Sequence, residues 1–151
     1  MKKLIILGVV VVALVLISLL YKGKEEKENK LQTIKINNTF LNVEIADTNQ
    51  EKIKGLSGRE GLSEDQGMLF VFEEEGSHGI WMKDMNFNID IAWIDKNKKI
   101  IYIEKDVSPS TYPKVFYGSQ KEEPLLSLYV LETKANFFEK VGIGIGDLVE
   151  F

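Results

Sequence analysis

The chain has 151 residues, a formal net charge of −4, one histidine and no cysteine. The lack of cysteine excludes disulfide bonds, thiolate metal sites and a cysteine nucleophile, and a single histidine excludes sites that need two imidazoles. Lys2 and Lys3 are the only charged residues before residue 22, so the remainder of the chain is more acidic than the whole. Because an acidic domain repels phosphate backbones, we expect no nucleic-acid partner.

The first 21 residues have the features of a membrane segment. Leu4–Leu20 is an uncharged apolar run of 17 residues. As a helix it would extend about 26 Å, close to the roughly 30 Å of a hydrocarbon core. It is longer than the apolar core of a cleavable signal, and no small-residue cleavage pattern follows it. Residues 1–21 are therefore predicted to be a transmembrane anchor or uncleaved signal, with secretion after cleavage as the alternative.

The lysines around this run set the expected orientation. Lys2 and Lys3 precede it, and positive charge next to a membrane segment stays on the cytoplasmic side. Lys22 and Lys24 compete from the other end, but the short N-terminal tail favours a single-pass cell-membrane protein with its domain outside the cytoplasm. Residues 22–31 are predicted to be a charged linker, and residues 32–151 an extracytoplasmic β domain.

The first elements of this domain are a hairpin and a short helix. Ile34 and Ile36 alternate with polar residues, Asn37-Asn38 suits a tight turn, and residues 40–45 pair back. Thr48 followed by Glu51 is a capping box, which predicts the start of a helix that ends at Gly55 or Gly58.

Further strands are predicted at residues 67–72, 79–82, 89–95, 100–105 and 127–133 and at the C-terminus from residue 146, with a second helix at 134–142 that Gly142 closes. Residues 107–124 contain all three prolines and are predicted to form a long loop that covers the site as a lid. Strands rarely alternate with helices in this order. We therefore predict a mostly β fold with two short helices. It should be a compact, mainly antiparallel barrel or sandwich, preceded in the sequence by one N-terminal transmembrane helix.

Several segments resemble a known family. These are GLSGREGL with Arg59, GMLFVF, IWMKDMNFNIDIAWID, YVLET and the closing GIGDLVEF, and together they cover residues 33–151. They are similar to the family catalogued as domain of unknown function 192, short bacterial and archaeal proteins of which many have an export segment. The resemblance implies a small β-barrel-like fold and no established activity. The chain departs from the family pattern at Asp84 and Met85, where Asn-Thr is usual, and at Asn88 and Ile89, where Pro-Leu is usual.

Charged residues within apolar strands mark a candidate site. Asp90 interrupts one apolar strand and Glu132 ends another, and a lone buried charge is costly unless it is paired or faces a cavity. Lys83 and Arg59 are the expected partners. The set allows three interpretations: a buried ion pair that fixes strand register, a ligand pocket, or acid–base catalysis. The predicted ligand-binding residues are Arg59, Trp81, Lys83, Asp90 and Glu132.

A soft metal site is a further alternative. Met82, Met85 and His78 could bind Cu(I), since thioether sulfur suits that ion, although methionine in a β domain usually fills the core. We expect no resident cofactor. The predicted function is a membrane-anchored extracytoplasmic binding or accessory module for a small molecule, sugar or peptide. The alternatives are an envelope-associated hydrolase that uses Asp90 or Glu132 with Lys83, and a methionine-based copper-handling protein.

Overall fold

The computed structural model describes residues 31–120 and 123–151. The predicted anchor at Leu4–Leu20 and almost all of the predicted linker lie outside these residues. Within the described residues, no helix has the length and apolar character needed to cross a bilayer.

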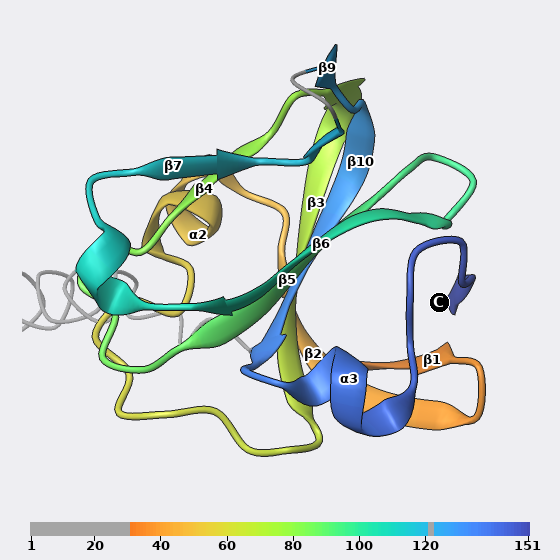
Figure 1. Ribbon diagram of the computed structural model, residues 1–151, viewed down its shortest axis with the longest axis horizontal. Coiled ribbons are helices and arrows are strands. Elements are labelled where there is room, and N and C mark those ends of the chain that lie inside the picture. The colour runs from red at the N-terminus through yellow and green to blue at the C-terminus, as the bar shows by residue number, and fades with distance from the viewer. Residues whose placement is uncertain (1–30, 121–122) are drawn as a thin grey trace, which may run out of the picture.

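The main feature of the domain is a seven-stranded sheet (Figure 1). In spatial order its strands are β11 (Val149–Glu150), β1 (Leu31–Ile36), β2 (Thr39–Ala46), β3 (Gln66–Gly76), β10 (Ser127–Lys134), β5 (Ile89–Ile94) and β6 (Ile100–Val107). Neighbouring strands are antiparallel except β2 and β3. These two are parallel because α2 (Asn49–Lys54) lies in the connection between them and lets the chain cross over. The prediction of a mostly β, mainly antiparallel fold with two short helices is confirmed.

The sheet curls into a half-barrel, and its two edges meet through the main chain. Lys99, just before β6, forms an isolated antiparallel bridge with Leu148, just before β11. The N–H of Ile100 donates to the carbonyl of Asp147 at 2.9 Å, and the N–H of Val149 donates to the carbonyl of Lys98 at 2.8 Å. The first and last parts of the domain are thereby held against β6.

Local sequence signals account for the turns and helix ends. Asn37 in the first hairpin turn has a positive φ of 54°, as the Asn-Asn pair predicted. Thr48 and Glu51 form the predicted capping box, in which the N–H of Thr48 donates to Oε2 of Glu51 at 2.9 Å. The helices α2 and α3 (Phe137–Val141) end at Gly55 and Gly142, as predicted.

The proline-containing segment differs from its predicted state. It contains a 3₁₀ turn, η1 (Pro109–Thr111), and three short strands, β7 (Val115–Tyr117), β8 (Ser119–Gln120) and β9 (Glu123–Pro124). β7 pairs with β4 (Gly79–Trp81), and the buried ring of Phe116 contributes to the core. The prediction of a long loop was wrong because the β-forming run Val115–Tyr117 has a strand partner more than 30 residues away in the sequence.

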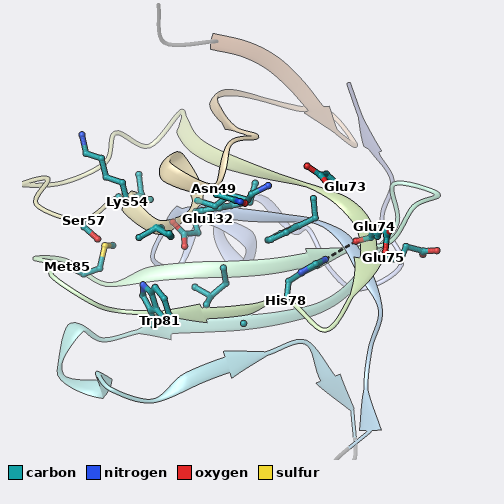
Figure 2. A pocket seen from close by; sticks show the side chains of 18 residues that line it. Asn49, Lys54, Ser57, Glu73, Glu74, Glu75, His78, Trp81, Met85 and Glu132 are labelled. Carbon is teal, nitrogen blue, oxygen red and sulfur yellow. Dashed lines mark hydrogen bonds between the residues drawn. The ribbon is translucent and has the colours of Figure 1, made fainter. Parts of the chain in front are cut away.

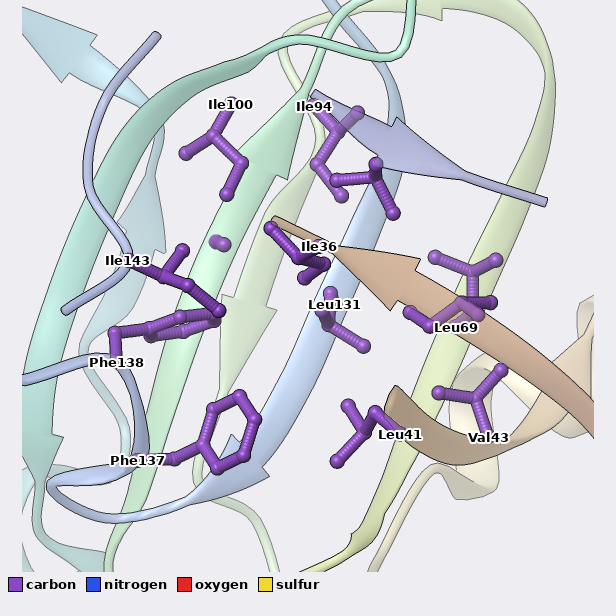
Figure 3. Close-up of a cluster of buried hydrophobic side chains, with 13 residues drawn as sticks. Ile36, Leu41, Val43, Leu69, Ile94, Ile100, Leu131, Phe137, Phe138 and Ile143 are labelled. Carbon is purple, nitrogen blue, oxygen red and sulfur yellow. The ribbon is translucent and has the colours of Figure 1, made fainter. Parts of the chain in front are cut away.

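Both faces of the sheet are covered. One face packs against α3 and the C-terminal segment, through a core that includes Ile36, Leu131 and Phe138 (Figure 3). The other face packs against β4, β7 and the segment after α2, through Leu56, Phe116 and the fully buried Trp93, among others. Figure 1 shows α2, β4 and β7 together on this second side. Every residue of β5 is buried, so its alternating side chains pack on both faces of the sheet.

Candidate functional site

Asp90 is buried and is satisfied by the main chain. Its Oδ1 accepts N–H donors from Asp106 at 2.9 Å and Asn136 at 3.0 Å, and its Oδ2 accepts from the N–H of Phe138 at 3.3 Å. The first donor is available because the β5–β6 register shifts between Ile89 and Ile91 and Asp106 adopts a positive φ of 51°. Asp90 therefore connects β5, β6 and the start of α3, and its carboxylate is fully used within the scaffold.

Lys83 lies on the surface and does not approach Asp90. Its main-chain carbonyl accepts a hydrogen bond from the hydroxyl of Ser57 at 2.8 Å. Among the residues that the structure describes, its ammonium group has no ion-pair partner. The expected Lys83–Asp90 pair does not form, because backbone amides satisfy the aspartate and the lysine remains solvated.

Arg59 has a different partner from those expected. Its Nη1 and Nη2 bind the two carboxylate oxygens of Glu44 on β2, the second at 2.8 Å. This bidentate hydrogen bonding raises the pKa of Arg59 and lowers that of Glu44, against an opposing effect of partial burial. Sequence reasoning missed Glu44, because it occupies an ordinary polar position in an alternating strand.

Glu132 on β10 is the predicted site residue that faces a cavity. Its side chain is 4% exposed and lies on the sheet face opposite Asp90, because its neighbour Thr133 is the residue that pairs with Asp90. Within the described part of the chain its carboxyl makes no hydrogen bond or ion pair. Burial raises its pKa to about 8, and the charge of Arg59 opposes that rise. The carboxyl is therefore mostly protonated at neutral pH.

The cavity next to Glu132 has a volume of about 670 Å³ (Figure 2). Its walls come from α2 and the three residues that follow it, the second half of β3, β4 with the residue before it, and Met85. The apolar wall residues include Ile53, Leu56, Phe70 and Ile80. Trp81, which is 43% exposed, also lines the cavity. The described residues of the proline-containing segment, 107–120 and 123–124, contribute nothing to these walls and do not form the predicted lid.

The predicted copper ligands do not converge. Met82 is buried in the core and does not line the cavity, whereas Met85 and His78 lie at opposite ends of it with Glu132 between them (Figure 2). The His78 ring stacks on Phe72 with 3.5 Å between ring centroids, and its Nε2 lies 3.1 Å from the carbonyl oxygen of Glu74. Burial lowers the pKa of His78, so its ring is neutral at pH 7.

The fold and the cavity define a small β half-barrel domain with one buried acid at a cavity wall. The chain belongs to the family called domain of unknown function 192, described as Uncharacterized ACR, which matches residues 32–151. This confirms the family resemblance found in the sequence. A search of the curated proteins found no match.

Two solved structures share the fold. One is a candidate transcription regulator from Sinorhizobium meliloti, with 26% identity, a TM-score of 0.73, and coverage of 83% of this chain and 96% of that one. The other is a protein of unknown function from Novosphingobium aromaticivorans, with 22% identity, a TM-score of 0.74, and coverage of 85% and 90%. Neither description assigns a role to the cavity.

Proposed function

We propose that this protein is a membrane-anchored, extracytoplasmic module that binds a small molecule, sugar or peptide in the cavity beside Glu132. The observation that carries the proposal is a buried carboxyl that opens on a cavity and has no partner among the described residues. A structural acid is normally satisfied by the protein, as Asp90 is by three backbone amides.

The energetics favour a ligand at this position. A buried polar group without a hydrogen bond costs about 1–3 kcal/mol, and a ligand that supplies the missing partner recovers part of that cost. The apolar wall beside the carboxyl would contribute further through burial of ligand surface. Polar and charged side chains also line the cavity, and small-molecule sites commonly combine apolar walls with polar groups that orient the ligand.

The proposed location comes from the sequence. The apolar run Leu4–Leu20 with Lys2 and Lys3 before it supports an anchor that places the domain outside the cytoplasm. The acidic net charge argues against a nucleic-acid partner, although one protein of similar fold is described as a candidate transcription regulator.

An envelope-associated hydrolase is the second candidate. It is favoured by the raised pKa of Glu132, since a carboxyl that stays protonated near neutral pH can act as a general acid. The proposed helpers Asp90 and Lys83 do not line the cavity with it, so the binding module is the better supported function.

The test is ligand-dependent thermal shift on the full chain in detergent, against a panel of sugars, short peptides and small polar organic molecules. A ligand of the cavity raises the melting temperature of the wild type and of Lys83→Ala, which alters only an exposed side chain. It does not stabilise Glu132→Leu, whose folding is checked by circular dichroism. Equal stabilisation of all three proteins would contradict the proposal, and turnover of a panel member that Glu132→Leu abolishes would favour the hydrolase.

A further inference from the structure

The chemistry of the Glu132 carboxyl narrows the class of ligand, if the cavity is the binding site proposed above. Across the sheet, Glu132 is flanked by Met68 of β3 and Ile91 of β5, which are both buried and apolar. Neither neighbouring side chain can donate a hydrogen bond to it. The cation whose charge acts on Glu132 is Arg59, and both of its terminal nitrogens are engaged by Glu44.

A protonated carboxyl in such surroundings has a fixed pattern of one donor and one acceptor. Its hydroxyl donates, and its carbonyl oxygen accepts. The complementary ligand group is an amide edge, in which an adjacent C=O and N–H make two parallel hydrogen bonds to the acid. An anionic carboxylate offers only acceptors, and a cation offers only donors and would require Glu132 to ionise among apolar residues.

Other charged groups at the cavity supply little net attraction for an ion. The basic residues there or next to it are Lys52, Lys54 and Arg59. The acidic residues there or next to it are Glu44, Glu73, Glu74 and Glu75. Lys52 donates to the carbonyls of Asp47 and Val71, and Glu75 pairs with Lys96 at 2.9 Å. His78 is neutral at pH 7, because burial lowers its pKa.

The apolar walls define the rest of the ligand. Leu56, Phe70 and Ile80 are buried residues of the wall, while Ile53 and Trp81 are exposed there. An aromatic or aliphatic body placed against these side chains would be removed from water, and Trp81 offers a ring for stacking.

We propose that the cavity selects an uncharged ligand with an amide edge on an apolar body, and that the Glu132 carboxyl binds this edge through two hydrogen bonds. A lactam, a primary carboxamide and a peptide amide on an apolar group all belong to this class. The inference rests on the proposed function and names the ligand chemistry of that same cavity.

Benzamide, benzoate and benzamidine test this inference, because they share size and shape but are neutral, anionic and cationic. Binding to the full, isotope-labelled chain in detergent is followed by NMR titration at pH 6.5, using the amide signals of cavity residues. Benzamide should bind at least tenfold more tightly than either ion. Its affinity should fall as the pH rises through 8 and Glu132 loses its donor proton.

Two variants distinguish a failure of the inferred ligand class from a failure of the proposed binding site. Glu132→Gln keeps one donor and one acceptor, so it should retain benzamide binding and lose its pH dependence above 7. Glu132→Leu should weaken benzamide binding at least tenfold. If benzoate or benzamidine binds best and Glu132→Leu abolishes that binding, the amide inference is overturned and the binding function stands. If no probe perturbs the cavity signals, or if all three bind Glu132→Leu as they bind the wild type, the inference and the proposed site both fail.

Discussion

Replacement of Glu132 by glutamine should change how stability depends on pH. The folded state raises the pKa of Glu132 from 4.5 to about 8, so between these values the native protein holds a proton that the unfolded chain releases. Stability contributed by this group is therefore present below pH 4.5 and declines as the pH rises to 8. At 1.36 kcal/mol per pKa unit, the wild type should lose about 4 kcal/mol from this group between pH 5 and pH 9.

Glu132→Gln removes the titration and keeps the size of the side chain. In urea unfolding at pH 5, 7 and 9, the free energy of unfolding of the variant should increase relative to that of the wild type as the pH rises. The increase over the full range should be about 4 kcal/mol. Glu73→Gln is the matched control, because it makes the same chemical change at an exposed position of the cavity wall. A constant difference between wild type and Glu132→Gln from pH 5 to pH 9 would refute the reasoning.

Three more predictions concern Asp90, Arg59 and Gly118. Asp90→Ala should destabilise the domain by at least about 3 kcal/mol in urea unfolding, because three backbone donors lose a charged acceptor; a loss below about 1 kcal/mol would contradict its role as a connector. Arg59→Met should raise the pKa of Glu132 further, as measured by carboxyl-carbon NMR titration, since the Arg59 charge lowers it; an unchanged or lower value would show that this charge does not reach the carboxyl. Gly118→Ala places a Cβ 2.7 Å from Cγ of Trp93 and should cost about 1–3 kcal/mol through overpacking, so an unchanged melting temperature would mean that the ring moves aside freely.

Local signals were enough to predict most elements of the fold. The hairpin turn at Asn37 and the capping box at Thr48 depend on residues that are close in the sequence, and both formed as expected. Pairing between β4 and β7 is non-local and was not predicted. The three prolines of the segment favoured a loop, although the segment contains the β-forming run Val115–Tyr117. The parallel β2–β3 pair also escaped prediction, because one short helix in an otherwise β-rich chain does not reveal a crossover.

The candidate site was predictable only in part. A charged residue in an apolar strand signals that something must compensate it, and this singled out both Asp90 and Glu132. The pattern could not show that backbone amides from two distant segments satisfy Asp90. Almost every residue type has a backbone N–H, so the sequence does not indicate which of them donate to the aspartate. Nor could it show that Arg59 is engaged by Glu44 rather than by the two buried acids.

The placement of the two buried acids on opposite faces of the sheet has a consequence for how the protein can change. Asp90 holds strands and a helix together on one side, while Glu132 meets the cavity on the other. Evolution or protein engineering could therefore change the residues around Glu132, and with them the specificity of the cavity, without disturbing the hydrogen bonds of Asp90 that hold the fold together.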